Sequence, residues 1–248
     1  MIYQSFAAVY DCLMDHSLYG QWRDYTLQML QNKHRVLELA CGTGDLAILL
    51  KQAGLEVVGL DLSNEMLSIA SEKASEAAVT LPLLQGDMLD LEAIGTFEAV
   101  TCFDDSICYM PDLAHVQQVF EQVYRSLEPG GQFLFDAHSL YQMDELFPGF
   151  MYNDKTAETA FMWTSYAGEV PHSVEHDLSF FVWDDEINGY QELNELHHER
   201  TYPVTDYVAA LEAVGFKNVS VSADFGRQIV QEDSVRWFFS AVKPVADA

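Results

Sequence analysis

Short apolar runs alternate with helix-like segments through the first half of the chain. Strands are expected at 36–39, 56–60, 80–84, 97–103 and 132–135. Between them, helical patterns cover 46–52 and 113–127, and Ser63 is placed to cap another helix. This alternation predicts a parallel sheet with helices on both of its faces.

The two ends of the chain complete this α/β core. Residues 5–31 carry apolar positions at helical spacing. Thr205 is expected to cap a helix that ends at Gly215, and 216–223 and 235–242 are expected to be the last strands. We predict a Rossmann-like core of seven strands, in which a ligand binds at the carboxyl ends of the strands.

The pattern changes between residues 150 and 202, where β-branched and aromatic residues predominate. Asn188-Gly189 is a strong hairpin signal, and 160–169 is expected to add a further strand. An inserted antiparallel β-layer is therefore predicted. Counting outward from a two-residue turn gives these pairs: Ile187 with Tyr190, Trp183 with Asn194, Phe181 with Leu196 and Asp177 with Arg200.

Charge narrows the range of partners. The 248 residues include 39 Asp and Glu against 12 Lys and Arg, a formal net charge of −27. Such a surface repels polyphosphate backbones, so nucleic acid is not an expected partner.

Cysteine spacing and hydropathy indicate the cellular compartment in which the protein is expected to act. The four cysteines lack the spacing of a zinc site or a disulfide framework, which indicates reduced thiols in a cytoplasmic protein. No signal peptide is visible, and the apolar runs are too short to span a membrane.

The segment VLELACGTGDL, residues 36–46, predicts a strand that feeds a ligand-binding turn. Gly42 and Gly44 let the backbone approach a ligand, and Asp61 at the end of the next strand is suited to ribose hydroxyls. The run from Gly42 to Ala47 also satisfies the dinucleotide fingerprint G-x-G-x-x-G/A, so a nicotinamide cofactor remains an alternative. Glu38 favours a cationic ligand over a pyrophosphate, because an acid repels phosphate.

The chain resembles the class I S-adenosylmethionine-dependent methyltransferases, in VLELACGTGDL, VVGLDLSNEML, QGDMLDL, FEAVTCFDDSICYM and LEPGGQFLFDAH, in family order. The resemblance implies the seven-stranded methyltransferase sheet and S-adenosyl-L-methionine as cofactor. It implies a cofactor site built from Glu38, Ala40, Gly42, Gly44, Asp61, Leu62, Asp87, Met88 and Phe103. Ala40 stands where the family often has glycine, so the turn should be slightly less close there.

The N-terminal pattern and the β-insert are similar to small-molecule methyltransferases, including bacterial aminosugar N-methyltransferases. This resemblance implies an N-terminal helical lid at 1–33, with Tyr10 and Tyr19 near the cofactor. The cofactor-binding core would then comprise 34–149 and 203–248. The insert, 150–202, would contact substrate or a second copy of the chain in a homodimer.

Methyl transfer needs alignment and exclusion of water more than acid catalysis. The candidates for a base are Asp104, Asp105 and His138, and Tyr109 is a candidate for orienting the substrate. A folded-over insert could also bring in one of its histidines, which are His172, His176, His197 and His198. We expect no metal, and a small-molecule N or O acceptor, with an amine favoured by an acidic and aromatic pocket. The alternatives are a protein or, less favoured, an RNA methyltransferase, a nicotinamide-dependent oxidoreductase and a non-catalytic nucleoside-binding module.

Overall fold

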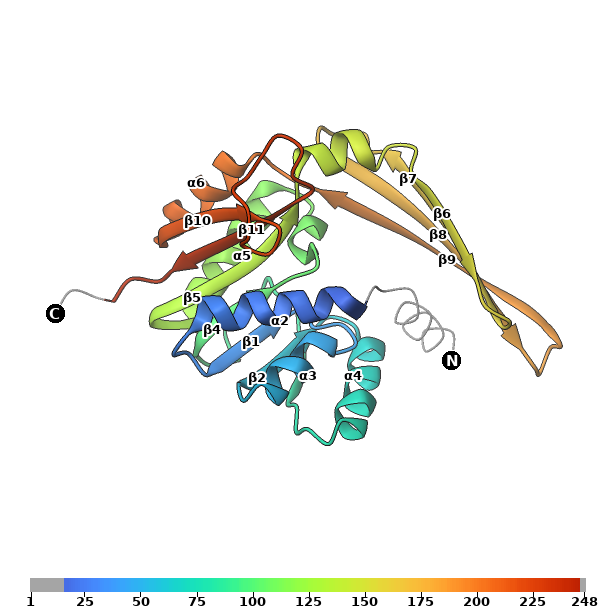
Figure 1. Ribbon diagram of the computed structural model, residues 1–248, viewed down its shortest axis with the longest axis horizontal. Coiled ribbons are helices and arrows are strands. Elements are labelled where there is room, and N and C mark those ends of the chain that lie inside the picture. The colour runs from blue at the N-terminus through green and yellow to red at the C-terminus, as the bar shows by residue number, and fades with distance from the viewer. Residues whose placement is uncertain (1–15, 246–248) are drawn as a thin grey trace.

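A computed structural model describes residues 16–245 (Figure 1). An α/β core and a long curved sheet make up this part of the chain. The first half of the core comprises α2 (His16–Leu30), β1 (Arg35–Leu39), α3 (Asp45–Gln52), β2 (Glu56–Asp61), α4 (Asn64–Glu76), β3 (Leu83–Gln85), β4 (Phe97–Cys102), a short 3₁₀ helix η1 (Ser106–Tyr109), α5 (Leu113–Ser126) and β5 (Leu127–His138). After the insert come α6 (Val204–Val214), β10 (Lys217–Ala223) and β11 (Arg236–Val242).

The seven strands of the core follow the order β10-β11-β5-β4-β1-β2-β3. Strands β1 to β5 are parallel, and β11 runs antiparallel between β5 and β10. Helices α2, α3 and α4 lie on one face and α5 and α6 on the other (Figure 1). This is the predicted Rossmann-like sheet with helices on both faces, and its order reverses between β1 and β4, where a ligand site is expected.

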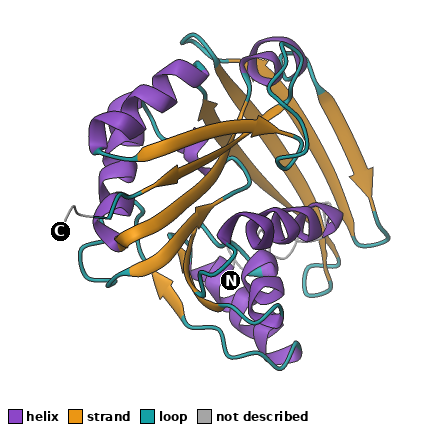
Figure 2. Cartoon of the chain, turned by 60° about the vertical axis from the view of Figure 1, so that its left-hand side comes forward, coloured by secondary structure: helices purple, strands orange, loops and turns teal. Residues whose placement is uncertain are grey.

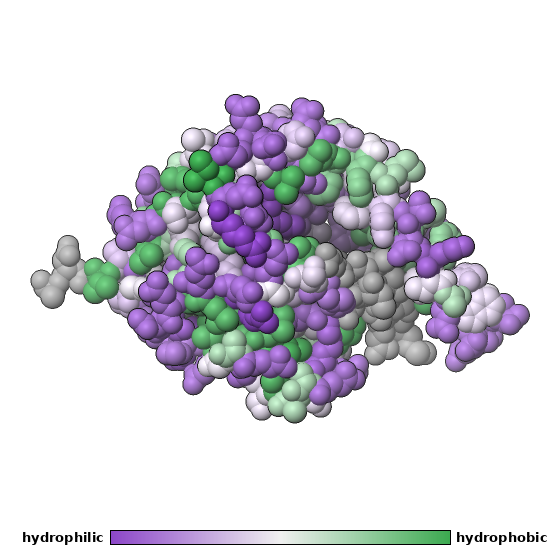
Figure 3. All heavy atoms as spheres, in the orientation of Figure 1, coloured by the Kyte–Doolittle hydropathy of each residue, from purple (hydrophilic) through white to green (hydrophobic). Residues whose placement is uncertain are grey.

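Buried apolar side chains hold each helical layer to the sheet. On one face Trp22 and Tyr25 of α2 pack with strand residues such as Phe238, and on the other Phe120 of α5 packs against Phe133 and Phe135. Ser63 caps α4 as predicted, by accepting a hydrogen bond from the Met66 backbone N–H. Hydrophilic side chains predominate on the face drawn in Figure 3, in keeping with the acidic composition.

The insert forms a second sheet, which Figure 2 shows as a separate curved layer. A short π-helical segment η2 (Gln142–Leu146) leads into it, and its strands run in the order β6 (Met151–Lys155), β7 (Thr159–Ala167), β8 (Ser173–Asp184) and β9 (Gly189–Arg200). Every neighbouring pair is antiparallel, as predicted. One side of this sheet buries Phe161 and Phe180 toward the core, while Met162, Tyr166 and Leu196 are exposed on the other side.

The predicted register of the hairpin is wrong by four residues. Trp183 pairs with Tyr190 and Asp177 pairs with Leu196, whereas Arg200 pairs with Ser173. The turn is longer than two residues because the Asp184 carboxylate accepts hydrogen bonds from the backbone N–H groups of Glu186 and Ile187. This side-chain bonding replaces the tight turn that Asn188-Gly189 indicates.

Three smaller expectations also need correction. The third strand is shorter than predicted and begins after Pro82. The segment LEPGG belongs to β5 rather than to a loop, because Gly130 and Gly131 exchange backbone hydrogen bonds with Lys243. Helix α6 begins at Val204 without a side-chain cap, so Thr205 lies inside the helix.

Candidate functional site

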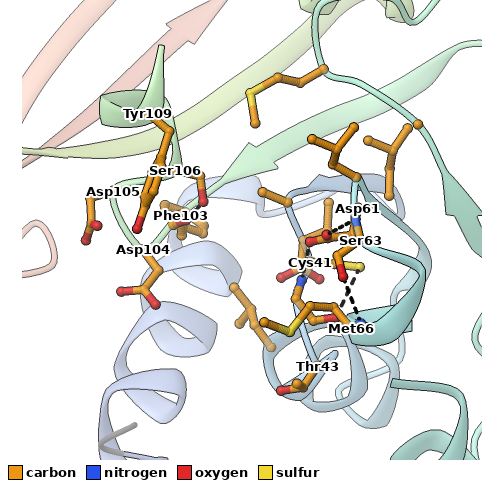
Figure 4. Close-up of a pocket in the computed structure, with 18 of the residues that line it drawn as sticks. Cys41, Thr43, Asp61, Ser63, Met66, Phe103, Asp104, Asp105, Ser106 and Tyr109 are labelled. Atoms are coloured by element: carbon orange, nitrogen blue, oxygen red, sulfur yellow. Dashed lines mark hydrogen bonds between the residues drawn. The ribbon is translucent and has the colours of Figure 1, made fainter. Parts of the chain in front are cut away.

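The carboxyl ends of β1, β2 and β4 surround a cavity of about 630 Å³. Figure 4 shows its walls, with Asp61, Ser63 and Met66 facing Phe103, Asp104 and Tyr109 across the space. Most of the predicted site residues lie on these walls: Tyr19, Glu38, Ala40, Gly42, Asp61, Leu62, Asp87, Met88, Phe103, Asp104 and Tyr109.

The turn after β1 follows a left-handed backbone. Ala40, Gly42 and Gly44 have φ values of 50°, 54° and 82°. Ala40 is thus a residue with a side chain in a conformation that favours glycine. Gly44 does not line the cavity. It caps α3, where an added Cβ would lie 2.9 Å from the Ala70 Cβ, so its role is to let α3 and α4 approach each other.

Asp61 holds this turn in place. Its Oδ2 accepts a hydrogen bond from the Gly42 N–H and its Oδ1 accepts one from the Ser63 N–H, each at 2.8 Å (Figure 4). A carboxylate has about four acceptor positions, so two remain for a ligand. Burial raises the pKa of Asp61, although the backbone hydrogen bonds oppose this shift.

Glu38 is a buried acid with an unused oxygen. Its side chain is 4% exposed, and Oε2 has no hydrogen-bond partner among the residues described. Burial, reinforced by the negative charges of Asp45 and Asp61, raises the pKa of Glu38 to about 8. A bound cation would complete this environment, since an unpaired buried carboxylate is strongly disfavoured.

The far end of the cavity is more exposed. Asp87 bonds the backbone N–H of Leu89 through Oδ1 at 2.9 Å, and Leu62 is 70% exposed. Met88 and Phe103 provide apolar wall on either side. Tyr19 of α2 reaches the cavity, whereas Tyr10 lies outside the described residues.

A second cavity of about 310 Å³ lies between the core and the inner side of the four-stranded sheet. Four residues line both cavities: Asp104, Asp105, Tyr109 and His197. Aromatic side chains supply much of the remaining wall: Phe147, Tyr152, Phe161, Trp163 and Phe180. His138 belongs to this second cavity and does not line the first.

Arg236 of β11 is the central cation of the second cavity. Its guanidinium lies 2.6 Å from Asp105, 3.1 Å from Asp136 and 3.7 Å from Asp104. Asp136 is fully buried and also accepts hydrogen bonds from the Trp22 indole N–H and the Asp105 backbone N–H, both at 2.8 Å. This network fixes the loop after β4, in which Asp104 and Asp105 have positive φ values.

The network gives its acids different proton affinities. Burial alone would raise the pKa of Asp105, but interactions with the neighbouring His138 imidazole and Arg236 guanidinium hold it well below its usual range. Burial raises the pKa of Asp136 despite the neighbouring Arg236. Asp105 is therefore the ionised partner of the guanidinium.

His138 stands between two carboxylates. Its Nε2 lies 3.2 Å from Asp105 Oδ1 and 3.7 Å from Glu199 Oε2. Glu199 is 5% exposed, and burial and the nearby Asp105 charge raise its pKa well above the usual value. The structure thus brings the predicted His138 together with an acid from the insert.

A second series of hydrogen-bonded polar groups lies where the two cavities meet. The Tyr109 hydroxyl lies 3.0 Å from His197 Nδ1, and His197 Nε2 lies 2.8 Å from Glu195 Oε2. Tyr109 belongs to η1 and the other two to β9, so this series ties the insert to the core.

Glu199, Arg236 and Asp136 were not among the predicted site residues, whereas two of the insert histidines, His176 and His197, do line the second cavity. Asp136 carried a visible signal, because it is an acid inside the apolar run of β5. Glu199 lies in a stretch where apolar and polar residues do not alternate, and Arg236 follows a polar loop. The sequence pattern therefore gave no sign that either residue belongs to the site.

The comparisons with known proteins agree with this architecture. Residues 36–131 match a family described as a methyltransferase domain. The chain is 43% identical over 244 residues, 98% of each chain, to a Bacillus subtilis protein named "Putative methyltransferase YqeM". Within residues 16–245, no helix has the length and apolar character to cross a bilayer.

Solved structures show the same fold. An S-adenosylmethionine-dependent methyltransferase from Clostridium acetobutylicum has a TM-score of 0.84 and 28% identity, over 98% of this chain and 99% of that chain. The sugar N-methyltransferase KedS8 from Streptoalloteichus has a TM-score of 0.78 and 22% identity, over 96% and 92%. These matches decide between the methyl donor and the nicotinamide alternative, and the chain belongs to the S-adenosylmethionine-dependent methyltransferase family.

Proposed function

We propose that this protein methylates an amine nitrogen of a small molecule, with the cofactor in the first cavity and the acceptor in the second. The observation that carries this proposal is the shared wall of Asp104, Asp105, Tyr109 and His197 between the two cavities. A donor and an acceptor placed on the two sides of this junction would meet in line, which is the main requirement of the reaction.

The first cavity fits the parts of S-adenosylmethionine. We assign the ribose hydroxyls to the two remaining acceptor positions of Asp61, and the adenine to Asp87, Met88 and the adjoining Leu62. The unpartnered oxygen of Glu38 suits the ammonium or sulfonium charge of the methionine part. When bound, the cofactor supplies a methyl group on a positively charged sulfur.

The second cavity fits a cationic organic acceptor. It combines acids on the core side with aromatic rings on the insert side, and both attract an ammonium group. KedS8, which shares this fold, is named for N-methylation of a sugar, so the architecture accommodates a nitrogen acceptor. The volume of about 310 Å³ suits a small molecule better than a folded protein segment.

We assign the removal of the acceptor's proton to His138 and the orientation of the acceptor to Asp104 and Tyr109. An ammonium nitrogen has no lone pair, so it must lose a proton before it can attack the methyl group. His138 Nε2 lies 3.2 Å from Asp105 Oδ1 and 3.7 Å from Glu199 Oε2, on the wall of the acceptor cavity. Asp104 and Tyr109 lie at the junction, where the reacting nitrogen must be.

We further propose a division of labour along the chain. Residues 34–149 and 203–248 bind the cofactor, 150–202 cover the acceptor, and 1–33 act as a lid. The position of α2 beside the first cavity supports the last assignment, through Tyr19. Buried free thiols at Cys41, Cys102 and Cys108 support action in the reducing cytoplasm.

A homodimer through the exposed side of the four-stranded sheet is also proposed. Met162, Tyr166 and Leu196 are about half exposed there, at 47%, 52% and 55%. Light scattering after size exclusion should give twice the mass of one chain, and Leu196→Lys should lower it. A monomeric wild type would reject this assembly.

An acceptor screen tests the proposed function. S-adenosylhomocysteine release is measured with small primary and secondary amines and with size-matched alcohols and phenols. We expect turnover of amines, with rates reduced at least tenfold by His138→Asn. Equal turnover of amines and neutral phenols would remove the basis for an amine acceptor.

A further inference from the structure

We propose that Glu199 selects the acceptor, by binding the positive charge of a protonated amine in the second cavity. The proposal rests on the proposed function, because it names the group that recognises the same acceptor. Glu199 belongs to β9, whose inner side faces the core, and it lines the second cavity but not the first.

The Glu199 carboxylate is buried, and one of its two oxygens has no partner. Its Oε2 has no hydrogen-bond partner among the described residues, and the 3.7 Å to His138 Nε2 is too long for a hydrogen bond. Oε1 lies 3.6 Å from His176 Nε2, and the Tyr109 hydroxyl donates a hydrogen bond to the carboxylate. An ammonium group brings several N–H donors and a full charge, which is what such a carboxylate lacks.

His176 faces Glu199 as a neutral group. Its Nδ1 accepts a hydrogen bond from the Trp163 indole N–H at 3.2 Å and lies 2.7 Å from the Ser165 hydroxyl. An indole can only donate, so the proton of the neutral ring is on Nε2, toward Glu199. Burial lowers the pKa of His176 to about 4, and the ring therefore supplies no positive charge at neutral pH.

Acids outnumber cations around this carboxylate. Arg236 makes its ion pairs with Asp104, Asp105 and Asp136, and none of these pairs includes Glu199. The titratable groups that face Glu199 from the neighbouring elements are Asp104, Asp105 and Tyr109 around η1, His138 of β5, His176 of β8 and Arg236 of β11. Burial, followed by the negative charge of Asp105, raises the pKa of Glu199 well above its usual value, in agreement with this surplus of acids.

Aromatic rings complete a site for an organic cation. The ring of Phe147 lies 4.9 Å from that of His138 and 4.7 Å from that of His176, and the ring of Trp163 lies 5.3 Å from that of His176. These rings therefore surround the two histidines that flank Glu199. Ring faces attract alkylammonium groups by about 0.5–2 kcal/mol each.

A divalent metal would fit this position less well. Atoms of Asp105, His138 and Glu199 lie within 4.8 Å of one another, which is a spacing that can hold a metal. However, Asp105 Oδ1 already lies 2.6 Å from the Arg236 guanidinium, so a metal there would stand beside a buried cation. A singly charged ammonium near Glu199 meets less of that repulsion than a divalent ion does.

The test compares cyclohexylammonium with cyclohexanol, a neutral molecule of similar shape, by calorimetry at pH 8. Wild type should bind the ammonium at least tenfold more tightly than the alcohol, and Glu199→Gln should abolish that preference. Glu192→Gln is the matched control, because Glu192 lies on the same strand with its side chain on the opposite side of the sheet, and it should change the preference by less than twofold.

Equal affinity for both probes in wild type, or a preference that survives Glu199→Gln, would overturn the proposal. So would tight Mn²⁺ binding that displaces the ammonium. Circular dichroism and S-adenosylhomocysteine binding check that Glu199→Gln is folded, and Glu199→Asp, which keeps the charge, should retain part of the preference. Amine turnover without a Glu199-dependent preference would reject this inference alone, whereas a preference without methyl transfer would reject the proposed function alone.

Discussion

The buried acid of the cofactor cavity, Glu38, should make cofactor binding depend on pH. In the free protein its pKa is about 8, so the carboxyl is mostly neutral at pH 7. A positively charged group beside Oε2 favours the ionised form, and binding must then release a proton. Affinity should therefore rise with pH below 8 and become constant above it.

The expected magnitude follows from that pKa. Each pH unit below the pKa lowers the affinity about tenfold, or about 1.4 kcal/mol. Half of the Glu38 carboxyl is ionised at pH 8 and about one hundredth at pH 6, so the affinity for S-adenosylhomocysteine, which keeps the ammonium of the amino-acid end, should fall about 50-fold between them, or about 2.3 kcal/mol. Glu38→Gln has nearly the same shape and cannot ionise, so its affinity should be weaker at pH 8 and nearly independent of pH.

Isothermal titration at pH 6, 7 and 8 measures this dependence. Glu56→Gln is the control, since Glu56 is an exposed residue at the start of β2 and should leave the wild-type slope unchanged. A flat profile in wild type would refute the reasoning. A slope that persists in Glu38→Gln would assign the proton to another group.

Four further predictions address the same region. Glu38→Gln should raise the melting temperature of the ligand-free protein at pH 9 but not at pH 4, because a raised carboxyl pKa costs stability as pH rises from the unfolded value toward 8; an unchanged melting temperature at pH 9 would contradict this. Asp61→Asn should weaken S-adenosylhomocysteine binding at least 100-fold in calorimetry, since hydrogen bonds to a charged group contribute about 1.5–3 kcal/mol each. In addition, the amide NH₂ of asparagine would face one of the two backbone N–H donors that Asp61 now accepts from. Gly44→Ala should lower the free energy of unfolding in urea by about 2 kcal/mol, because the left-handed backbone disfavours a side chain and the new methyl group would meet Ala70. Gly20→Ala, at a position on α2 with open space around it, should instead raise the free energy of unfolding by about 0.5–1 kcal/mol. Trp22→Phe should cost about 1–3 kcal/mol in the same assay, because it removes a hydrogen bond from the fully buried Asp136. A neutral effect would show that Arg236 and the Asp105 backbone N–H satisfy that carboxylate without the indole.

The core of the fold was predictable because local signals and tertiary structure agree there. Apolar runs that are buried on both faces become β1, β4 and β5, and Ser63 forms the cap that its position indicates. The polar residues at strand ends, such as Glu38 and Asp61, meet in one cavity because parallel strands end at the same edge. The sequence therefore carried most of the cofactor side of the site.

The acceptor side was less predictable, because its residues come together only through tertiary contacts. The loop of the hairpin depends on one side chain, Asp184, which outweighs the turn preference of Asn188-Gly189. The error of four residues preserved the alternation of faces but shifted every cross-strand partner. Glu199 and His138 are 61 positions apart, and no local pattern predicts that the insert brings them within 3.7 Å.

The position of Arg236 bears on how the protein is made. β11 pairs with β5, yet it is synthesised about 100 residues later, after the whole insert. In a nascent chain whose β11 is still inside the ribosome, Asp105 and Asp136 have no counter-ion from Arg236, and burying both carboxylates without it is strongly disfavoured. The acceptor side of the site should thus fold last. A chain that is terminated before β11 should leave this side unfolded and sensitive to proteases, and it should not be partly active.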